Sequence, residues 1–187
     1  MKQLLLTLFI SANALSQSIG INDLIDFKTQ SVGKIEETLI LKNWVLDEVH
    51  ENNRTGVFEL LGNEKIYIFR LNDNYNKEIA KIFITVNDKN TDNNGIKYST
   101  EDSELNQKII LNLKRNDFNM IESGTDLVNM NFNPKVNDIL VKDSILKKYS
   151  DGQNEVNLTT NIFVKVVKVE KENYYSNNYK TVYELSL

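Results

Sequence analysis

The chain has 187 residues and a formal net charge of −4, with 41% hydrophobic and 26% charged residues. This composition is typical of a folded domain rather than of a disordered chain. Acidic and basic residues are interspersed, so the sequence lacks the basic patch that a nucleic-acid partner requires. Because cysteine is absent, disulfides, thiolate metal sites, thiol catalysis and a lipid-modified cysteine are excluded.

The first sixteen residues have the pattern of a signal peptide. Lys2 supplies the positive start, residues 4–10 form a short apolar run, and Ala14 and Ser16 are small residues before Gln17. The apolar run is well short of the roughly 20 residues that a membrane-spanning helix needs. We therefore expect an exported protein, periplasmic or secreted, with no membrane span and no lipid anchor. The abundance of Asn, Lys and Ile is typical of an AT-rich bacterial genome.

The expected domain organisation has three parts. Residues 1–16 form the signal peptide, 17–34 an N-terminal helix and linker, and 35–187 one antiparallel β-domain. The short helix is predicted over residues 18–29, because Ile21, Leu24 and Ile25 recur with helical spacing.

From residue 35 onward the apolar residues recur mainly at every second position, which predicts strands. Asn94-Gly95 and Asp151-Gly152 indicate tight hairpins, residues 173–178 indicate a turn, and residues 99–105 one helical turn. About ten strands at such spacing predict an all-β fold, an antiparallel β-sandwich or β-barrel. The expected strands cover residues 38–49, 57–61, 65–71, 80–86, 109–113, 118–121, 128–132, 136–141, 145–149, 156–170 and 183–187.

One loop has the spacing of a calcium-binding loop. Asn90, Asp92, Asn94 and Glu101, with Gly95, fit the pattern N-x-D-x-N-G-x5-E. In such loops oxygen ligands alternate along the chain, glycine makes the sharp turn and the final glutamate binds calcium bidentately. The alternative is a plain hairpin loop, because a chain this rich in Asn and Asp matches the pattern easily.

Aromatic residues provide the main candidates for ligand or partner binding. Tyr174, Tyr175 and Tyr179 lie close together near the C-terminus, and Trp44 is the only tryptophan. Tyrosine combines a flat apolar ring with a hydroxyl group, which suits sugars and protein partners. The alternative is that these residues pack in the core of the sheet.

Catalytic patterns are weak. His50 is the only histidine, so a zinc site with two or three histidines is excluded, and a Ser-His-Asp triad would have to use this residue. Paired carboxylates of the glycosidase type stay open, because their separation is spatial. The available acids include Glu36, Glu37, Asp47, Glu48, Glu59, Glu101, Asp102 and Glu104.

The sequence therefore predicts an exported β-domain with a non-catalytic role, binding a small ligand, a glycan or an extracytoplasmic protein. Calcium is the one cofactor that the residues suggest. The alternatives are a secreted carboxylate-dependent hydrolase of extracellular polymers, and an envelope or assembly component. In the latter, residues 183–187 would pair with another chain by strand addition.

Overall fold

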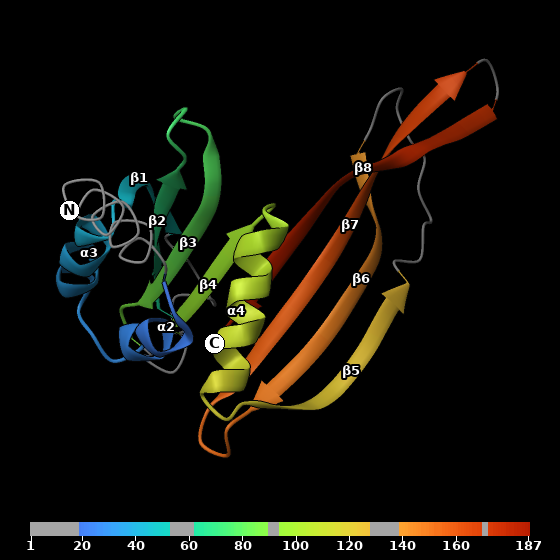
Figure 1. Cartoon of the computed structure of the whole chain (residues 1–187). Coiled ribbons are helices and arrows are strands. Elements are labelled where there is room, and N and C mark those ends of the chain that lie inside the picture. The colour runs from blue at the N-terminus through green and yellow to red at the C-terminus, as the bar shows by residue number, and fades with distance from the viewer. Residues whose placement is uncertain (1–18, 53–61, 90–93, 128–138, 170–171) are drawn as a thin grey trace, which may run out of the picture. The chain divides into compact units, whose positions relative to one another are not determined.

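A computed structural model of the chain describes residues 19–52, 62–89, 94–127, 139–169 and 172–187. These residues are mostly β, with eight strands in one antiparallel sheet and three short helices (Figure 1). None of these helices is long and apolar enough to cross a membrane. The helices are α2 (Ile21–Phe27), α3 (Val32–Leu41) and α4 (Ser103–Arg115). The strands are β1 (Val45–Asn52), β2 (Glu64–Asn72), β3 (Glu78–Asn87), β4 (Gly95–Thr100), β5 (Asn119–Leu127), β6 (Ile139–Ser150), β7 (Glu155–Val169) and β8 (Glu172–Ser186).

The strand order of the sheet is β1-β2-β3-β4-β8-β7-β6-β5. The first four strands follow the chain order, and the last four run in reverse, so that the C-terminal strand β8 lies between β4 and β7. The all-β prediction is confirmed in this coarse sense. The described strands number eight and form an open sheet with β1 and β5 at its two ends, so neither a sandwich nor a closed barrel is confirmed.

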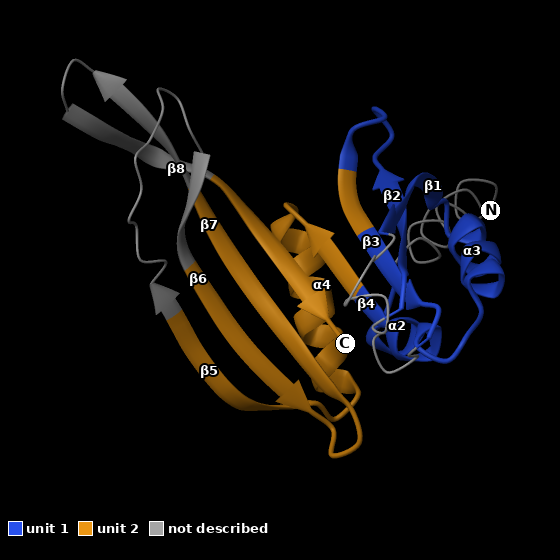
Figure 2. Cartoon of the chain, turned by 180° about the vertical axis from the view of Figure 1, so that it is seen from behind, with its two compact units in different colours: residues 1–78, 82–96 blue, residues 79–81, 97–187 orange. Residues whose placement is uncertain are grey.

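The chain divides into two compact units (Figure 2). Unit 1 contains residues 1–78 and 82–96, and unit 2 contains residues 79–81 and 97–187. The boundary between the units falls within the sheet.

The core of unit 1 is built from two short helices and the inner strands. The predicted N-terminal helix is confirmed as α2, which buries three apolar side chains at helical spacing. Asp23 accepts hydrogen bonds from the Gly20 amide (2.8 Å) and the Lys42 ammonium (2.8 Å), and so ties the start of α2 to the end of α3. The fully buried side chains around them are Ile21, Leu24, Ile35, Leu39, Trp44, Phe69 and Ile82.

The strand expected over residues 38–49 is wrong in its first half, because α3 covers residues 32–41. Ile35 and Leu39 are four residues apart and both buried, so the helix places them on one face. Asn43, at a φ of 64°, then turns the chain, and the Trp44 amide donates to the Leu39 carbonyl at 2.9 Å. β1 begins only after this turn.

The core of unit 2 lies between α4 and one face of the sheet (Figure 1). Asn106, Ile109 and Leu113 form the buried stripe of α4. Residues that pair across neighbouring strands lie on the same face of the sheet. The pairing of β4, β6, β7 and β8 therefore places their buried residues on one face. These residues are Tyr98, Tyr149, Val156, Leu158 and Leu185.

The strand expected over residues 109–113 is wrong, because these residues lie inside α4. Ile109 and Leu113 are buried and Leu111 is exposed, which is the pattern of a helix and not of a strand. The predicted single turn near residue 100 is the start of this longer helix. Asp102 is its N-cap, and its carboxylate accepts from the Glu104 and Leu105 amides at 2.7 and 3.1 Å.

The long strands of unit 2 follow the sequence closely, with two differences. Residues 139–150 form one strand with a register shift between Val141 and Asp143, where a break between two strands was expected. Residues 173–178 lie within β8 and pair with β7, so the turn expected there is wrong. A bulge or bend was expected within residues 156–170, and register shifts do occur there, between Phe163 and Val166. The hairpin at Asp151-Gly152 is also confirmed, since it joins β6 to β7.

The signal peptide and the strands expected over residues 57–61 and 128–132 lie outside the described residues. They stay predictions from the sequence.

Candidate functional site

The two end strands of the sheet carry most of the exposed large hydrophobic side chains. Nine such side chains occur among the described residues, three of them on β1 and two on β5. Two more, Ile40 and Leu41, end the helix α3 that precedes β1. An exposed apolar side chain is informative when several gather at one place, because such patches mark interaction sites.

The β1 edge, which we define as the strand Val45–Asn52, is open to solvent along its length. Seven of its eight residues are exposed and one is half-buried. Val45, Leu46 and Val49 have exposed fractions of 52, 36 and 42%. Within the described residues, β1 has a paired neighbour on one side only, β2. Among the residues that the structure describes, the other side of β1 therefore has no pairing strand for its backbone amides and carbonyls.

The register of β1 on β2 shows which of its side chains share a face. Leu46 pairs with Phe69 and Val49 pairs with Tyr67, and the shift between Leu46 and Glu48 keeps both apolar residues on the same side. Because Phe69 is fully buried, this is the core side of the strand. Leu46 and Val49 therefore continue the apolar layer of unit 1 outward, at a position where a further strand would bury them.

Ion pairs hold the acids of the β1 edge against their neighbours. Glu51 contacts Lys65 on β2 at 2.7 Å, and Asp47 contacts Arg70 on the same strand at 3.2 Å. The hydrogen bond and charge of Lys65 lower the pKa of the Glu51 carboxyl. Glu48 contacts His50 at 2.7 Å. The side chains of Glu48 and Glu51 stay more than half exposed, so a partner has access to both carboxylates.

The β5 edge, Asn119–Leu127, is the corresponding strand at the other end of the sheet. Met120 and Ile121 are each 56% exposed, and a register shift separates Met120 from Glu122. Two exposed large hydrophobic side chains are described on β5, compared with three on β1.

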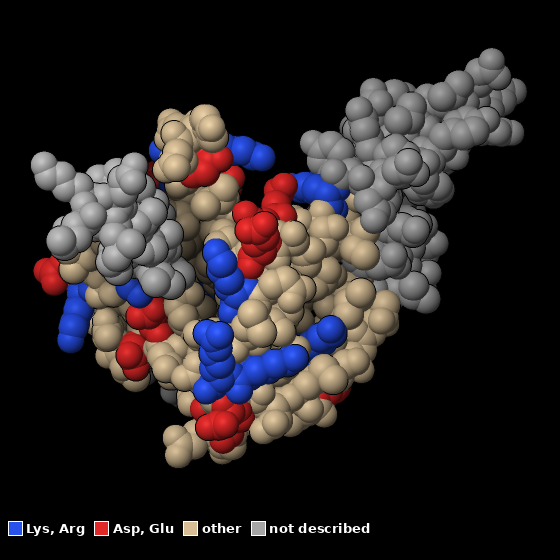
Figure 3. Space-filling view, in the orientation of Figure 1, with Lys and Arg blue, Asp and Glu red and all other residues tan. Residues whose placement is uncertain are grey.

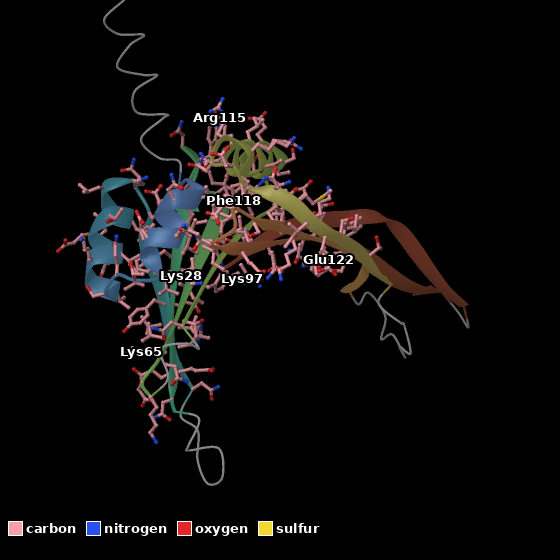
Figure 4. The ribbon with its side chains drawn as sticks, turned by 90° about the horizontal axis from the view of Figure 1, so that it is seen from below. Lys28, Lys65, Lys97, Arg115, Phe118 and Glu122 are labelled. Carbon is pink, nitrogen blue, oxygen red and sulfur yellow. The ribbon has the colours of Figure 1, made fainter. Side chains whose placement is uncertain are left out.

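A polar network covers the face of the unit 2 sheet opposite α4. The Ser144 hydroxyl donates to the Asn161 amide oxygen at 2.8 Å, and the Asn161 amide nitrogen donates to Glu184 at 2.9 Å. Glu184 also pairs with Lys97 at 2.5 Å. The network therefore links four neighbouring strands, β6, β7, β8 and β4. In Figure 4, Lys97 and Glu122 lie on the side of the sheet away from α4, which carries Arg115.

The opposite side of unit 2 carries charges of both signs. Figure 3 shows Lys, Arg, Asp and Glu side chains interspersed among uncharged atoms on the side where α4 lies. In this view several Lys and Arg side chains lie close together near the lower centre, with Asp and Glu side chains above and below them.

The aromatic candidates fall in different places. Trp44 is a core residue with 2% of its surface exposed, so its side chain does not form part of the surface. The backbones of Tyr174, Tyr175 and Tyr179 all lie in β8, where Tyr174 pairs with Val167 and Tyr175 with Val166. A binding role for these three tyrosines stays a prediction.

Two of the four calcium-ligand candidates have other partners in this structure. The Asn94 amide oxygen accepts from the Asn87 backbone amide at 2.8 Å, and the Glu101 carboxylate pairs with Lys180 at 2.8 Å. Asn90 and Asp92 lie outside the described residues. Within those residues, no three His, Cys, Asp or Glu side chains are grouped as a metal site requires.

The described carboxyl groups whose pKa is clearly shifted are Glu51 and Asp151, and both pKa values are lowered. In Asp151 the cause is hydrogen bonding from the Asn154 and Gln153 amides in the turn between β6 and β7. A glycosidase general acid needs the opposite change, a pKa raised by an apolar pocket or a second carboxylate. These two shifts therefore give the hydrolase alternative no support.

Sequence reasoning did not identify the β1 edge as a site. The signal that was present is the sequence Val45-Leu46-Asp47-Glu48-Val49, in which apolar and acidic residues mix without regular alternation. An ordinary half-buried strand alternates strictly, and here the register shift between Leu46 and Glu48 interrupts the alternation.

Comparison of the chain with protein-family models, with curated proteins and with solved structures found no match.

Proposed function

We propose that this chain is an exported, non-catalytic binding protein that recognises a protein partner through an exposed edge of its sheet. The observation that carries the proposal is the β1 edge, where three exposed apolar side chains accompany an unpaired strand side among the described residues. An extended segment added there gains backbone hydrogen bonds and buries Leu46 and Val49. Such β-augmentation requires only the backbone hydrogen-bonding groups and the side chains of an edge strand.

An open sheet supports a macromolecular partner over a small enclosed ligand. Small-molecule sites are concave and bury most of their ligand. The described strands form a sheet with two free ends instead of a closed wall. The strand-addition idea from the sequence placed the new contact at residues 183–187. In the structure this strand is flanked by β4 and β7, so an added strand would use β1 or β5 instead.

Site-specific cross-linking tests this proposal. A photoreactive amino acid is placed at Val49 on the β1 edge, and in a second variant at Tyr75, whose side chain is 91% exposed in the turn after β2. Tyr75 is the matched control, because it is more accessible than Val49 but lies outside the edge. We expect a discrete cross-linked protein from the Val49 variant in the exported fraction and none from Tyr75. Equal products from both positions, or none from Val49, would contradict the proposal.

Export itself rests on the pattern of residues 1–16. Mass spectrometry of the chain recovered from the exported fraction should find an N-terminus at Gln17. Recovery of the full chain, with Met1 in place and retained in the cytosol, would overturn this part of the proposal.

A second candidate function is glycan binding on the polar face of unit 2. The observation that favours it is the network from Ser144 to Lys97, which offers amide, hydroxyl and carboxylate groups in a row across four strands. Protein interfaces are depleted in such Lys, Glu and Ser residues, whereas sugar hydroxyls pair well with them. Screening the wild type and an Asn161→Ala variant on a glycan array tests it. A glycan bound equally well by both proteins would argue against this face.

A further inference from the structure

The charges of the strands differ sharply between the ends and the middle of the sheet. β1 carries Asp47, Glu48 and Glu51, and β5 carries Glu122 and Asp126, with no lysine or arginine on either strand. Each of the six inner strands carries at least one basic residue. One from each is Lys65, Lys81, Lys97, Lys147, Lys165 and Lys180.

Basic residues on β2 show how the acids of β1 are satisfied from one side. Lys65 and Arg70 pair with Glu51 and Asp47 across the strand boundary. A strand added on the outer side of β1 would lie next to these acids, as β2 does on the inner side. Opposite charges facing each other across neighbouring strands stabilise a pair, and like charges destabilise it.

The acidic edges disfavour a second copy of this chain as the occupant. Pairing β1 with another β1 brings the three acids of each strand together, and pairing it with β5 adds two further acids. Neither combination supplies a lysine or arginine. Lysine is the common protection on natural edge strands. In this chain acids have that protective role, and their mutual repulsion disfavours pairing with a second copy of the chain.

We propose that the β1 edge binds an extended segment of a different protein, in which apolar residues alternate with lysine or arginine. The apolar side chains would cover Leu46 and Val49 on the core side of β1. The basic side chains would lie on the other face of the segment, beside Glu48, which pairs with Ile68 and whose carboxylate is more than half exposed. The inference rests on the proposed function and adds the chemistry of the partner and the strand that receives it.

The test uses peptides of the same length as β1. One alternates valine with lysine and carries a fluorescent label. A second replaces every lysine by glutamate, and a third keeps lysine but has N-methylated amides along one edge, which prevents strand pairing. Binding to the purified chain at neutral pH and low salt is followed by fluorescence anisotropy. We expect the lysine peptide to bind at least about tenfold more tightly than the other two.

Charge reversal then locates the contact. In a Glu48→Lys variant, the lysine peptide should bind about tenfold more weakly and the glutamate peptide should gain affinity. The matched control is a Glu37→Lys variant, which changes the net charge equally at an exposed position on α3. It should keep the original preference. If the lysine variant does not fold, as judged by circular dichroism, the Glu48→Gln variant should still abolish the preference for lysine.

Three results would overturn the inference: equal affinity for the lysine and glutamate peptides, equal affinity for the N-methylated peptide, or an unchanged preference in the charge-reversed variant. The cross-linking experiment separates this failure from failure of the proposed function. A protein captured at Val49 without a preference for lysine peptides refutes only the basic chemistry. Absence of a captured protein at Val49 refutes the proposed function as well.

Discussion

The turn before β2 depends on the backbone conformation of one residue, Gly62. Gly62 precedes β2 with a φ of +77°, a conformation that L side chains rarely adopt. Next to it the Asp88 carboxylate accepts from the Asn63 backbone amide at 2.7 Å and from its side-chain amide at 3.1 Å. The turn before β2 is therefore held to the segment that follows β3.

A Gly62→Ala substitution tests this turn. The added Cβ would lie 2.5 Å from Asn87 Oδ1 and 2.7 Å from Asp88 Oδ1, in addition to the unfavourable φ. We expect a loss of about 2 kcal/mol or more in the free energy of unfolding, measured by urea denaturation. Gly33→Ala is the matched control. Gly33 lies in α3 with open space around it, so alanine there should stabilise the protein by up to about 1 kcal/mol. Two changes of the same sign would contradict this account.

Asp151 predicts a pH-dependent contribution to stability. Hydrogen bonds from the Asn154 and Gln153 amides, at 2.6 and 2.8 Å, lower the pKa of its carboxyl in the folded state. Its stabilising effect is therefore present above the unfolded value of about 4 and is lost as the pH falls through the lower folded value. Asp151→Asn should destabilise the protein at pH 7, and the difference in unfolding free energy should shrink toward about pH 2. A difference that does not change with pH would contradict the assignment.

At the scale of whole elements, the strands were more predictable from the sequence than the helices. Residues 65–71 and 80–86 alternate clearly and are strands. In α3 the run Thr38-Leu39-Ile40-Leu41 has the residue types of a strand, but the spacing of the buried Ile35 and Leu39 is helical. For residues 109–113, alternation and helical spacing share two residues, Ile109 and Leu113, so the pattern alone does not separate the two structures.

Alanine substitutions at Leu111 and Leu113 distinguish a helix from a strand directly. A strand would place both side chains on the same face, whereas in α4 Leu113 is fully buried and Leu111 is 50% exposed. We expect Leu113→Ala to cost about 2–5 kcal/mol of unfolding free energy, and Leu111→Ala less than about 1 kcal/mol. Chemical denaturation measures both. Similar costs at the two positions would be evidence for the strand.

The candidate site could not be predicted from the sequence, because edges are a property of the sheet order. Alternation shows that a segment is a strand, but not which strands are its neighbours. β8 ends the chain yet lies inside the sheet, and β5 lies in the middle of the sequence yet ends the sheet. Only the strand order shows that the acids of β1 and β5 lie at the two edges of the sheet.

At the scale of the molecule, the acidic edges predict how the chain associates with itself. At neutral pH the carboxylates of β1 and β5 repel those of another copy, so we expect a monomer. Acid removes the charge of carboxylates, and the lowered pKa of the Glu51 carboxyl keeps its charge to a lower pH than that of an ordinary glutamate. As the pH falls below about 4, the exposed apolar edges should pair and larger species should appear in analytical ultracentrifugation.

A Val49→Lys variant provides the control for this prediction. The lysine adds a positive charge that persists at low pH at the centre of the β1 edge. It should reduce the acid-induced association. Association of the wild type at neutral pH, or equal association of both proteins in acid, would show that the edge charges do not control it.

The central claim is that the β1 edge receives an added strand with basic side chains. Hydrogen–deuterium exchange of the chain, with and without the valine–lysine peptide, tests it most directly because it reports on the backbone of each strand. We predict slower exchange in residues 45–52 when the peptide is bound, and unchanged exchange in the inner strand β7. Protection elsewhere without any change in residues 45–52 would contradict the claim.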